Sequence, residues 1–289
     1  MTEVLTLVSL TADVAPLASR APGGVGDVTD RSGGGWRIAE RAVETDTALV
    51  PWLEQQAAAH GVDWAITPRG NRRKRLLISD MDSTIIGQEC LDELADFAGL
   101  KAEVSAITER AMRGELDFEG ALTQRVAMLK GLGLEALAAC HEERVRLNPG
   151  ARELVATMKA HGARCVLVSG GFRYFTSRVA AMAGFEADRA NTLIDDGSRL
   201  TGDVGRPILG REAKLAALLE ETAALGGTAD DALAMGDGAN DLDMIRAAGL
   251  GVAYKAKPVV AVQTRARIEH TDLRAALFFQ GYGVSDVRA

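Results

Sequence analysis

The chain has 289 residues, a formal net charge of −7 and a pI near 5.3, with 47% apolar and 25% charged residues. This length predicts one large domain with a smaller companion, and the apolar content is sufficient for a sizeable core. The acidic balance excludes a general nucleic-acid binder, because affinity for phosphate backbones requires clustered Lys and Arg. There is no secretory signal and no bilayer-length apolar run, and the three cysteines are widely spaced, so we expect a cytoplasmic protein with reduced thiols and no membrane partner.

Residues 1–70 are expected to form a small N-terminal α/β domain. In chain order we predict an apolar strand from Val4 to Leu10, a long Gly-rich loop over 21–35, an amphipathic helix over 46–59 and a short strand from Val62 to Thr67. The basic run that follows, from Arg69 to Arg75, is expected to be a solvated linker.

Residues 71–289 alternate between apolar strands and helices, as in a parallel α/β sheet. The clearest strands are predicted at 76–80, 165–169, 232–237 and 249–254. The first three end in Asp80, Ser169 and Asp237. Open α/β sheets bind ligands at the carboxyl ends of their strands, so these three side chains are expected to meet in one crevice.

A long helical insertion separates the first two of these strands. Residues from about 88 to 148 show helical periodicity, and they are too many for a simple crossover, so we expect them to form a helical cap over the crevice. The crossover helix is expected to begin after Gly150. Residues 191–206 carry an Asp-Asp-Gly-Ser turn between β-capable flanks, which predicts a hairpin.

Two carboxylates, Asp80 and Asp82, follow the strand at 76–80 and are separated by one residue. An ionised aspartate at a fixed strand end can attack phosphorus, and a second carboxylate nearby can donate and accept the proton. Because two such groups repel each other, the pair also favours a bound cation or a proton on one of them.

A second acidic segment, MGDGANDLDM, places Asp237, Asp241 and Asp243 in a Gly-rich loop after another strand. Hard oxygen ligands completed by water suit Mg²⁺. Taken alone, the segment is equally typical of a turn in which Asp and Asn cap a helix. Together with the Asp80 and Asp82 pair at the same sheet edge, it predicts a magnesium site.

These two segments resemble the haloacid dehalogenase superfamily of phosphohydrolases, which carries DxDx(T/V) first and GDGxND last. Within it, the order of DMDSTIIGQECLDELA, VSGGF and MGDGANDLDMIRAAGLGVAYKAKP is similar to the phosphoserine phosphatase family, from about Leu76 to Gly283. The resemblance implies a Rossmann-like parallel-sheet core with an inserted helical cap. It also implies hydrolysis of O-phospho-L-serine, the last step of serine biosynthesis.

The resemblance implies a role for each matching residue. Asp80 would be the nucleophile, and Asp82 the general acid that later activates water. Mg²⁺ would be held by Asp80, by the main-chain carbonyl of Asp82 and by Asp237, with Asp241 in support. The phosphate would be received by Ser169, Gly170, Gly171, Lys214 and Asn240.

The cap is expected to select the substrate. On the helix that starts near Phe118, Arg125 interrupts an apolar stripe. It either extends its guanidinium to water or grips a substrate carboxylate as a fork. In the resemblance Arg125 would bind that carboxylate and Glu89 the ammonium group, while Met112 and Phe118 would close over the substrate.

The sequence is also compatible with two other functions. One is a related phosphotransferase or phosphatase acting on another small phosphorylated amino acid, such as phosphohomoserine. Another is an amino-acid sensor that uses residues 1–70, whose size is compatible with an ACT-like regulatory domain. Phosphothreonine differs from phosphoserine by one methyl group, which an enzyme pocket discriminates only weakly, so phosphothreonine is not excluded as a substrate. The sequence also leaves open whether the chain forms a homodimer.

Overall fold

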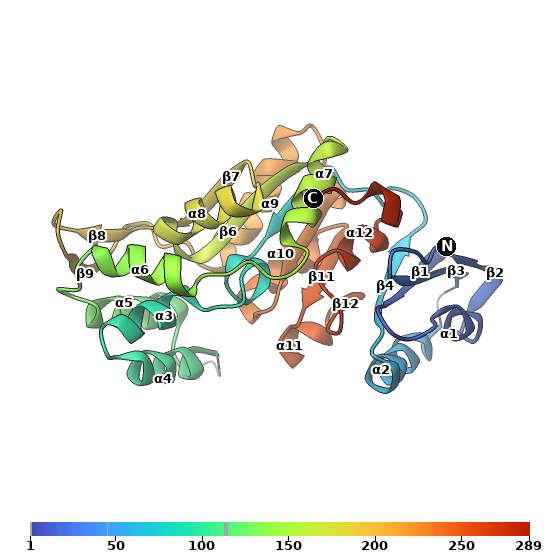
Figure 1. The fold of residues 1–289 in the computed structure, drawn as a ribbon, viewed down its shortest axis with the longest axis horizontal. Helices are drawn as coiled ribbons and strands as arrows, with labels where there is room; N and C mark the ends of the chain where they lie inside the picture. The colour runs from blue at the N-terminus through green and yellow to red at the C-terminus, as the bar shows by residue number, and fades with distance from the viewer. Residues whose placement is uncertain (1, 45, 113–114) are drawn as a thin grey trace.

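A computed structural model describes residues 2–44, 46–112 and 115–289, with the side chain of Met112 outside the described part. Ten strands form one sheet in the order β2-β3-β1-β4-β12-β11-β10-β5-β6-β7. Figure 1 shows the helical cap at one end of the long axis and strands β1 to β4 at the other. The predicted α/β fold class, with a mostly parallel core sheet, is confirmed.

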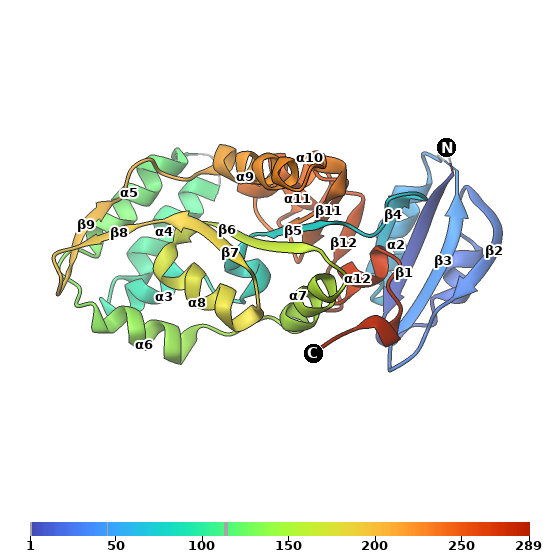
Figure 2. The ribbon, with the colours of Figure 1, turned by 90° about the horizontal axis from the view of Figure 1, so that it is seen from above.

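The core half of the sheet is parallel and lies between two layers of helices. Its strands are β5 (Leu76–Ser79), β6 (Arg164–Phe172), β7 (Ala187–Asn191), β10 (Ala232–Gly236), β11 (Leu250–Tyr254) and β12 (Ala266–Ile268). On one face are α7 (Ala151–Ala160), α8 (Arg173–Ala183) and α12 (Ala275–Phe279), and on the other are α9 (Arg211–Ala224) and α10 (Leu242–Ala247). Figure 2 shows these layers on either side of the strands, with α11 (Pro258–Ala261) beside α10. Apolar side chains are buried on both faces, which is why these strands are continuous apolar runs.

In the described part of the chain, the cap is a bundle of four helices inserted after β5. They are α3 (Cys90–Phe97), α4 (Lys101–Met112), α5 (Phe118–Met128) and α6 (Glu135–Arg144). The hairpin of β8 (Leu193–Asp195) and β9 (Leu200–Val204) also belongs structurally to the cap. The amide of Gly131 donates to the carbonyl of Leu200 at 2.8 Å, and the amide of Leu200 donates to the carbonyl of Leu132 at 2.9 Å. These bonds make the hairpin move with the cap if the cap opens.

Two linkers join the cap to the core, and they pair with each other. Ile86 and Leu147 form an antiparallel bridge, and the amide of Asn148 donates to the carbonyl of Ile85 at 2.8 Å. A few residues at the ends of elements can absorb the rotation when a cap opens and closes. We therefore expect the paired linkers to act as the hinge of the cap.

The N-terminal strands are β1 (Glu3–Ser9), β2 (Gly24–Asp30), β3 (Arg37–Val43) and β4 (Asp63–Pro68), with helices α1 (Ala15–Ser19) and α2 (Leu49–His60) on one face. The prediction of a loop over 21–35 is wrong for β2, because backbone pairing with β3 overrides the turn-forming glycines. Strand β4 also pairs antiparallel with β12, through Ala65 with Ala266 and Trp64 with Arg267. The N-terminal sheet is thus continuous with the core sheet.

The basic run at 69–75 lies between the two halves of this sheet. The prediction of a solvated linker is wrong for Arg72 and Lys74. Arg72 Nη2 lies 2.7 Å from Glu40 Oε1 and donates to the carbonyl of Phe279 at 3.1 Å. Lys74 is buried, and its Nζ donates to the carbonyls of Asn71 and Asp230, both at 2.7 Å. These bonds fasten the N-terminal strands to the core.

Asp63 gives a direct test of this attachment. Its buried carboxylate accepts the amides of Glu269, His270 and Thr271 at 2.7 to 2.9 Å and the Thr271 hydroxyl at 2.5 Å. Asp63→Ala leaves these donors unpaired, so we expect the free energy of unfolding to fall by about 3 kcal/mol in urea titration. Asp63→Asn, which keeps one acceptor oxygen, should cost less. If the wild type and Asp63→Ala are equally stable, the segment 269–271 is held by other contacts.

Candidate active site

A cavity of about 480 Å³ lies between the carboxyl edge of the core sheet and the cap. Its lining includes ten of the residues predicted from the sequence: Asp80, Asp82, Glu89, Phe118, Arg125, Ser169, Gly170, Gly171, Asp237 and Asn240. Two others, Lys214 and Asp241, are buried directly behind the floor of the cavity and bond to each other. Met112 ends α4, but its side chain lies outside the described residues, so its predicted contact stays a prediction.

The floor of the cavity is formed where three adjacent parallel strands end. Asp80 follows β5, Asp237 follows β10, and Ser169 lies near the end of β6. The turn after Asp80 spans Met81–Ile85, and the Asp80 carboxylate accepts the Met81 amide at 2.8 Å. This bond fixes the carboxylate at the strand end, as a nucleophile requires.

The Asp80 carboxylate is buried and paired with a buried lysine. Lys214 Nζ lies 2.8 Å from Asp80 Oδ1 and 2.6 Å from Asp241 Oδ1. Burial, together with the charges of Asp241 and Asp237, raises the pKa of Asp80 well above its usual range, although Lys214 opposes the shift. Burial alone would lower the pKa of Lys214, but Asp241 and Asp80 outweigh it and leave the pKa raised. The lysine therefore stays charged and holds both carboxylates.

Three buried carboxylates, Asp80, Asp237 and Asp241, each place an oxygen within 4.8 Å of the others. The Lys214 ammonium bonds two of these groups, Asp80 and Asp241. Burial, followed by the charge of Asp241, raises the pKa of Asp237 to about 7. Oxygen donors with excess negative charge suit a hard divalent cation, so the residues fit a metal site. This cluster includes the Asp241 side chain, which the sequence placed only in support, and not that of Asp82.

Asp82 faces the same cavity from the turn after β5. Its Oδ1 accepts the amide of Cys90, the first residue of α3, at 3.1 Å. Burial and the charge of Glu89 raise the pKa of Asp82 to about 7, while the bond from Cys90 opposes this. A carboxyl group with a pKa near neutrality can both donate and accept a proton.

The Ser-Gly-Gly segment closes the floor opposite Asp82. The Ser169 hydroxyl accepts the amide of Gly171 at 2.9 Å, and a Cβ built on Gly171 would lie 3.0 Å from Asp82 Oδ2. A Cβ on Gly170 would lie 2.9 Å from the ring of Phe118, which reaches down from α5. Glycines are needed here because the backbone forms the wall of the cavity. Strand β6 continues through this segment, and α8 begins directly after it at Arg173.

The roof of the cavity carries two opposite charges, Glu89 and Arg125. Glu89 accepts the Ser83 hydroxyl at 2.7 Å, and Arg125 Nη1 donates to the Thr108 hydroxyl at 3.0 Å. Burial raises the pKa of Glu89 and lowers that of Arg125, and each charge partly offsets the shift of the other. A ligand with both a cationic and an anionic group would find a partner for each.

The lining also includes residues that sequence reasoning missed, among them Thr108 and Lys257. Thr108 precedes Met112 by one helical turn on α4, so helical spacing could have identified it. Lys257 follows β11 at the carboxyl edge of the sheet, and its amide donates to the carbonyl of Asp237 at 2.9 Å. The rule that located Asp80 at a strand end could also have located Lys257.

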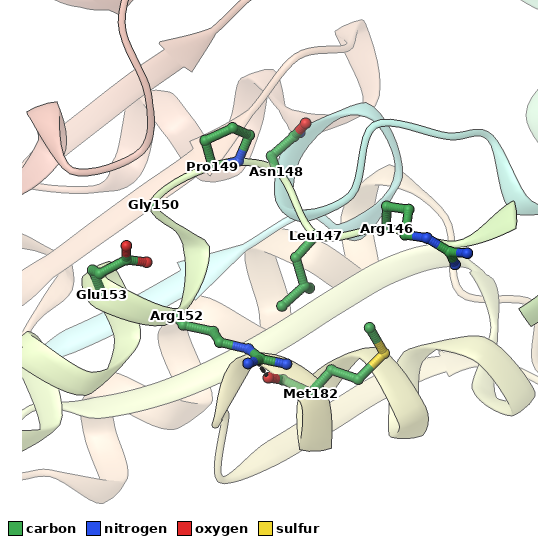
Figure 3. Close-up of a pocket in the computed structure, with 8 residues that line it drawn as sticks. All are labelled: Arg146, Leu147, Asn148, Pro149, Gly150, Arg152, Glu153 and Met182. Carbon is green, nitrogen blue, oxygen red and sulfur yellow. Dashed lines mark hydrogen bonds between the residues drawn. The ribbon is translucent and has the colours of Figure 1, made fainter. Parts of the chain in front are cut away.

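A second cavity, of about 360 Å³, lies beside the hinge (Figure 3). It is lined by Arg146, Leu147, Asn148, Pro149, Gly150, Arg152, Glu153 and Met182. Arg152 Nε donates to the carbonyl of Met182 at 2.9 Å, which ties α7 to α8 (Figure 3). None of the predicted site residues lines this cavity, so the chemistry is expected at the cavity under the cap.

The sheet edge and its cap define a class of protein: a hydrolase of α/β fold with a carboxylate-rich, cap-covered site. The chain belongs to the haloacid dehalogenase-like hydrolase family, whose model matches residues 77–246. This match begins in β5 and ends in α10, so it includes the predicted site residues.

The chain is also similar to individual proteins of known name. A phosphoserine phosphatase from Polaromonas sp. is 48% identical over 69% of this chain and 86% of its own length. One from Streptomyces coelicolor is 42% identical over 87% of this chain, and the match spans 62% of that protein.

Among solved structures, a haloacid dehalogenase family hydrolase from Salmonella enterica serovar Typhi has a TM-score of 0.86 at 29% identity, covering 96% of this chain and 98% of that one. A phosphoserine phosphatase bearing a phosphoaspartyl intermediate analogue has a TM-score of 0.68 at 37% identity, covering 72% and 99%. The first match includes the N-terminal strands, whereas the second is of a size to cover the core and cap only.

Proposed function

We propose that the chain hydrolyses O-phospho-L-serine to L-serine and inorganic phosphate through a phosphoaspartyl intermediate on Asp80. The observation that carries this proposal is one cavity with Asp80 on its floor and Glu89 and Arg125 on its roof. The floor suits phosphoryl transfer, and the roof suits the ammonium and carboxylate of an amino acid. The phosphoserine phosphatases among the relatives support the same substrate.

In the first step, an Asp80 carboxylate oxygen attacks phosphorus while the bond from phosphorus to the serine oxygen breaks. Asp82, whose pKa of about 7 allows it to carry a proton, donates that proton to the departing oxygen. In the second step, Asp82 takes a proton from water, the water oxygen attacks phosphorus, and the bond to Asp80 breaks. By microscopic reversibility, the group that protonates the leaving oxygen is also suited to take the proton from water, so Asp82 can do both.

The remaining floor groups bind the phosphoryl oxygens in this proposal. Ser169 and Asn240 would donate hydrogen bonds, Gly170 and Gly171 would let the backbone approach the phosphate closely, and Lys214 would balance charge on Asp80. We propose that Asp80, Asp237 and the Asp82 main-chain carbonyl hold Mg²⁺. Asp241 would support the ion through water, or support the site by holding Lys214. When bound, the ion would neutralise the repulsion between an anionic nucleophile and an anionic phosphate.

Residues 1–70 are proposed as a small domain that is ACT-like in size, next to the phosphatase domain at 71–289. No helix in the described part of the chain is long and apolar enough to cross a membrane. The cytoplasmic location and a homodimer stay predictions.

A phosphomonoester panel tests the proposed substrate. Phosphate release is measured from L-phosphoserine, phosphothreonine, phosphohomoserine and a sugar phosphate, with Mg²⁺ and with EDTA. We expect kcat/KM for phosphoserine to exceed that for the sugar phosphate by at least about 100-fold. A sugar phosphate has no ammonium or carboxylate group, so it would leave the buried charges of Glu89 and Arg125 unpaired. EDTA should abolish turnover, and Mg²⁺ should restore it.

Two results would contradict the proposal. A preference for the sugar phosphate would remove the assigned role of Glu89 and Arg125, and a preference for phosphohomoserine would favour the related enzyme considered above. Adding homoserine as an acceptor and finding its phosphate would indicate a phosphotransferase.

A further inference from the structure

Glu89 and Arg125 are each held by a hydroxyl side chain that has no assigned role. On the Glu89 side, the hydroxyl belongs to Ser83 and lies 2.7 Å from Glu89 Oε1. On the Arg125 side, it belongs to Thr108 and lies 3.0 Å from Nη1. Thr108 lines the cavity together with both charges.

Ser83 adopts a backbone conformation that is unusual for serine. Its φ is +54°, in the left-handed region, which costs a residue with a Cβ about 1–2 kcal/mol relative to a right-handed one. Its amide donates to the carbonyl of Gln88 at 3.2 Å, which closes the loop between the nucleophile turn and α3. Glycine would relieve the backbone strain but would remove the hydroxyl. The structure thus keeps a strained serine whose side chain orients Glu89.

Thr108 connects Arg125 to a carboxylate behind the cavity wall. Its hydroxyl accepts from Arg125 and lies 3.2 Å from Asp92 Oδ1 and 3.1 Å from the carbonyl of Val104 one helical turn earlier, while Asp92 Oδ2 accepts from Ser105 at 2.8 Å. Arg125 Nε also donates to the carbonyl of Ala121 at 3.2 Å. These two bonds fix the plane of the guanidinium. Among the described residues, the hydrogen bonds of Arg125 are made by Nε and Nη1, so Nη2 is available to a ligand carboxylate.

We propose that Ser83 and Thr108 are positioning residues for amino-acid recognition: Ser83 aims Glu89 at the ammonium group, and Thr108, backed by Asp92, aims Arg125 at the carboxylate. This inference rests on the proposed function and adds the residues that set its selectivity. A prepositioned fork loses less conformational entropy on binding, so the two hydroxyls act on affinity more than on the chemical step.

Two altered substrates test the role of Ser83 and the role of Thr108 separately. Phospholactate carries a hydroxyl in place of the ammonium group, and phosphoethanolamine lacks the carboxylate. Ser83→Ala keeps the backbone strain and removes only the hydroxyl. It should raise KM for phosphoserine about tenfold, the effect of losing one hydrogen bond to a charged group, with kcat changed little. The preference for phosphoserine over phospholactate should fall by the same factor.

Thr108→Val removes the other hydroxyl at nearly constant shape. The preference for phosphoserine over phosphoethanolamine should fall about tenfold, and Thr108→Ser should restore it. Ser177→Ala and Thr123→Val, at exposed positions on α8 and α5, are the matched controls. Equal losses on all three phosphates, or no rescue by Thr108→Ser, would show a structural role and overturn the proposal. A wild type that hydrolyses all three phosphates equally would instead contradict the proposed substrate, and with it this inference.

Discussion

Replacing Asp80 by asparagine is expected to lower kcat for phosphoserine by at least about 1,000-fold, because the amide cannot attack phosphorus. The fold should not suffer. Asp80 is 5% exposed and its pKa is raised by burial, so the neutral amide removes a charge that the surroundings disfavour. Lys214 keeps Asp241 as its partner at 2.6 Å. The free energy of unfolding should therefore equal or exceed that of the wild type.

Phosphate release and urea unfolding, measured on the same preparation, test both parts of this expectation. Asp203→Asn, an equivalent change at an exposed position in β9, should leave both quantities unaltered. Full turnover by Asp80→Asn would exclude a covalent intermediate on this residue. Loss of activity together with loss of stability would mean that the carboxylate supports the fold and would leave its role as nucleophile without support.

Replacing Lys214 by methionine is expected to have the second large effect, on stability as well as on rate. The lysine is 1% exposed, and methionine fills its space without its charge. Asp80 and Asp241 would then be buried without their cation. Removing one partner of a buried ion pair costs about 3–5 kcal/mol, and losing a fixed charge beside the reacting phosphate should lower kcat/KM by at least about 100-fold.

Added Mg²⁺ should restore part of the stability of Lys214→Met, because a cation that binds the folded acidic cluster shifts the unfolding equilibrium. Urea titrations in EDTA and in Mg²⁺ measure this difference, with the exposed Lys159→Met as the control. Wild-type stability of Lys214→Met in EDTA would contradict the view that this lysine neutralises the site. If Mg²⁺ stabilises the variant no more than it stabilises the wild type, the lysine and the metal do not both neutralise the acidic cluster.

The sequence predicted the core of the fold because its signals are local. Strands β5, β6 and β10 are continuous apolar runs, and a strand buried on both faces must be apolar throughout. Since parallel strands end at one edge, Asp80, Ser169 and Asp237 could be placed together without coordinates. Arg125 stood out for a similar reason, as a charge in an apolar helical stripe.

The signals were misleading where pairing between distant segments decides the structure. The glycines of β2 favour a loop, yet seven residues there form a strand beside β3. Arg72 has the composition of a solvated linker, yet Glu40 and the carbonyl of Phe279 hold it between the two halves of the sheet. Local composition cannot predict these contacts, because Glu40 lies 32 positions from Arg72 and Phe279 lies 207 positions from it.

The sequence by itself determined the class of chemistry, because the carboxylates that carry it follow predictable strands. Only the tertiary structure decided how those groups are held. Lys214 bonds Asp80 and Asp241, the Asp241 side chain joins the acidic cluster, and Ser83 and Thr108 hold the two charges of the roof. The reason is physical: periodicity fixes which face of an element a residue occupies, whereas a hydrogen bond or ion pair depends on the packing of separate elements to within an ångström.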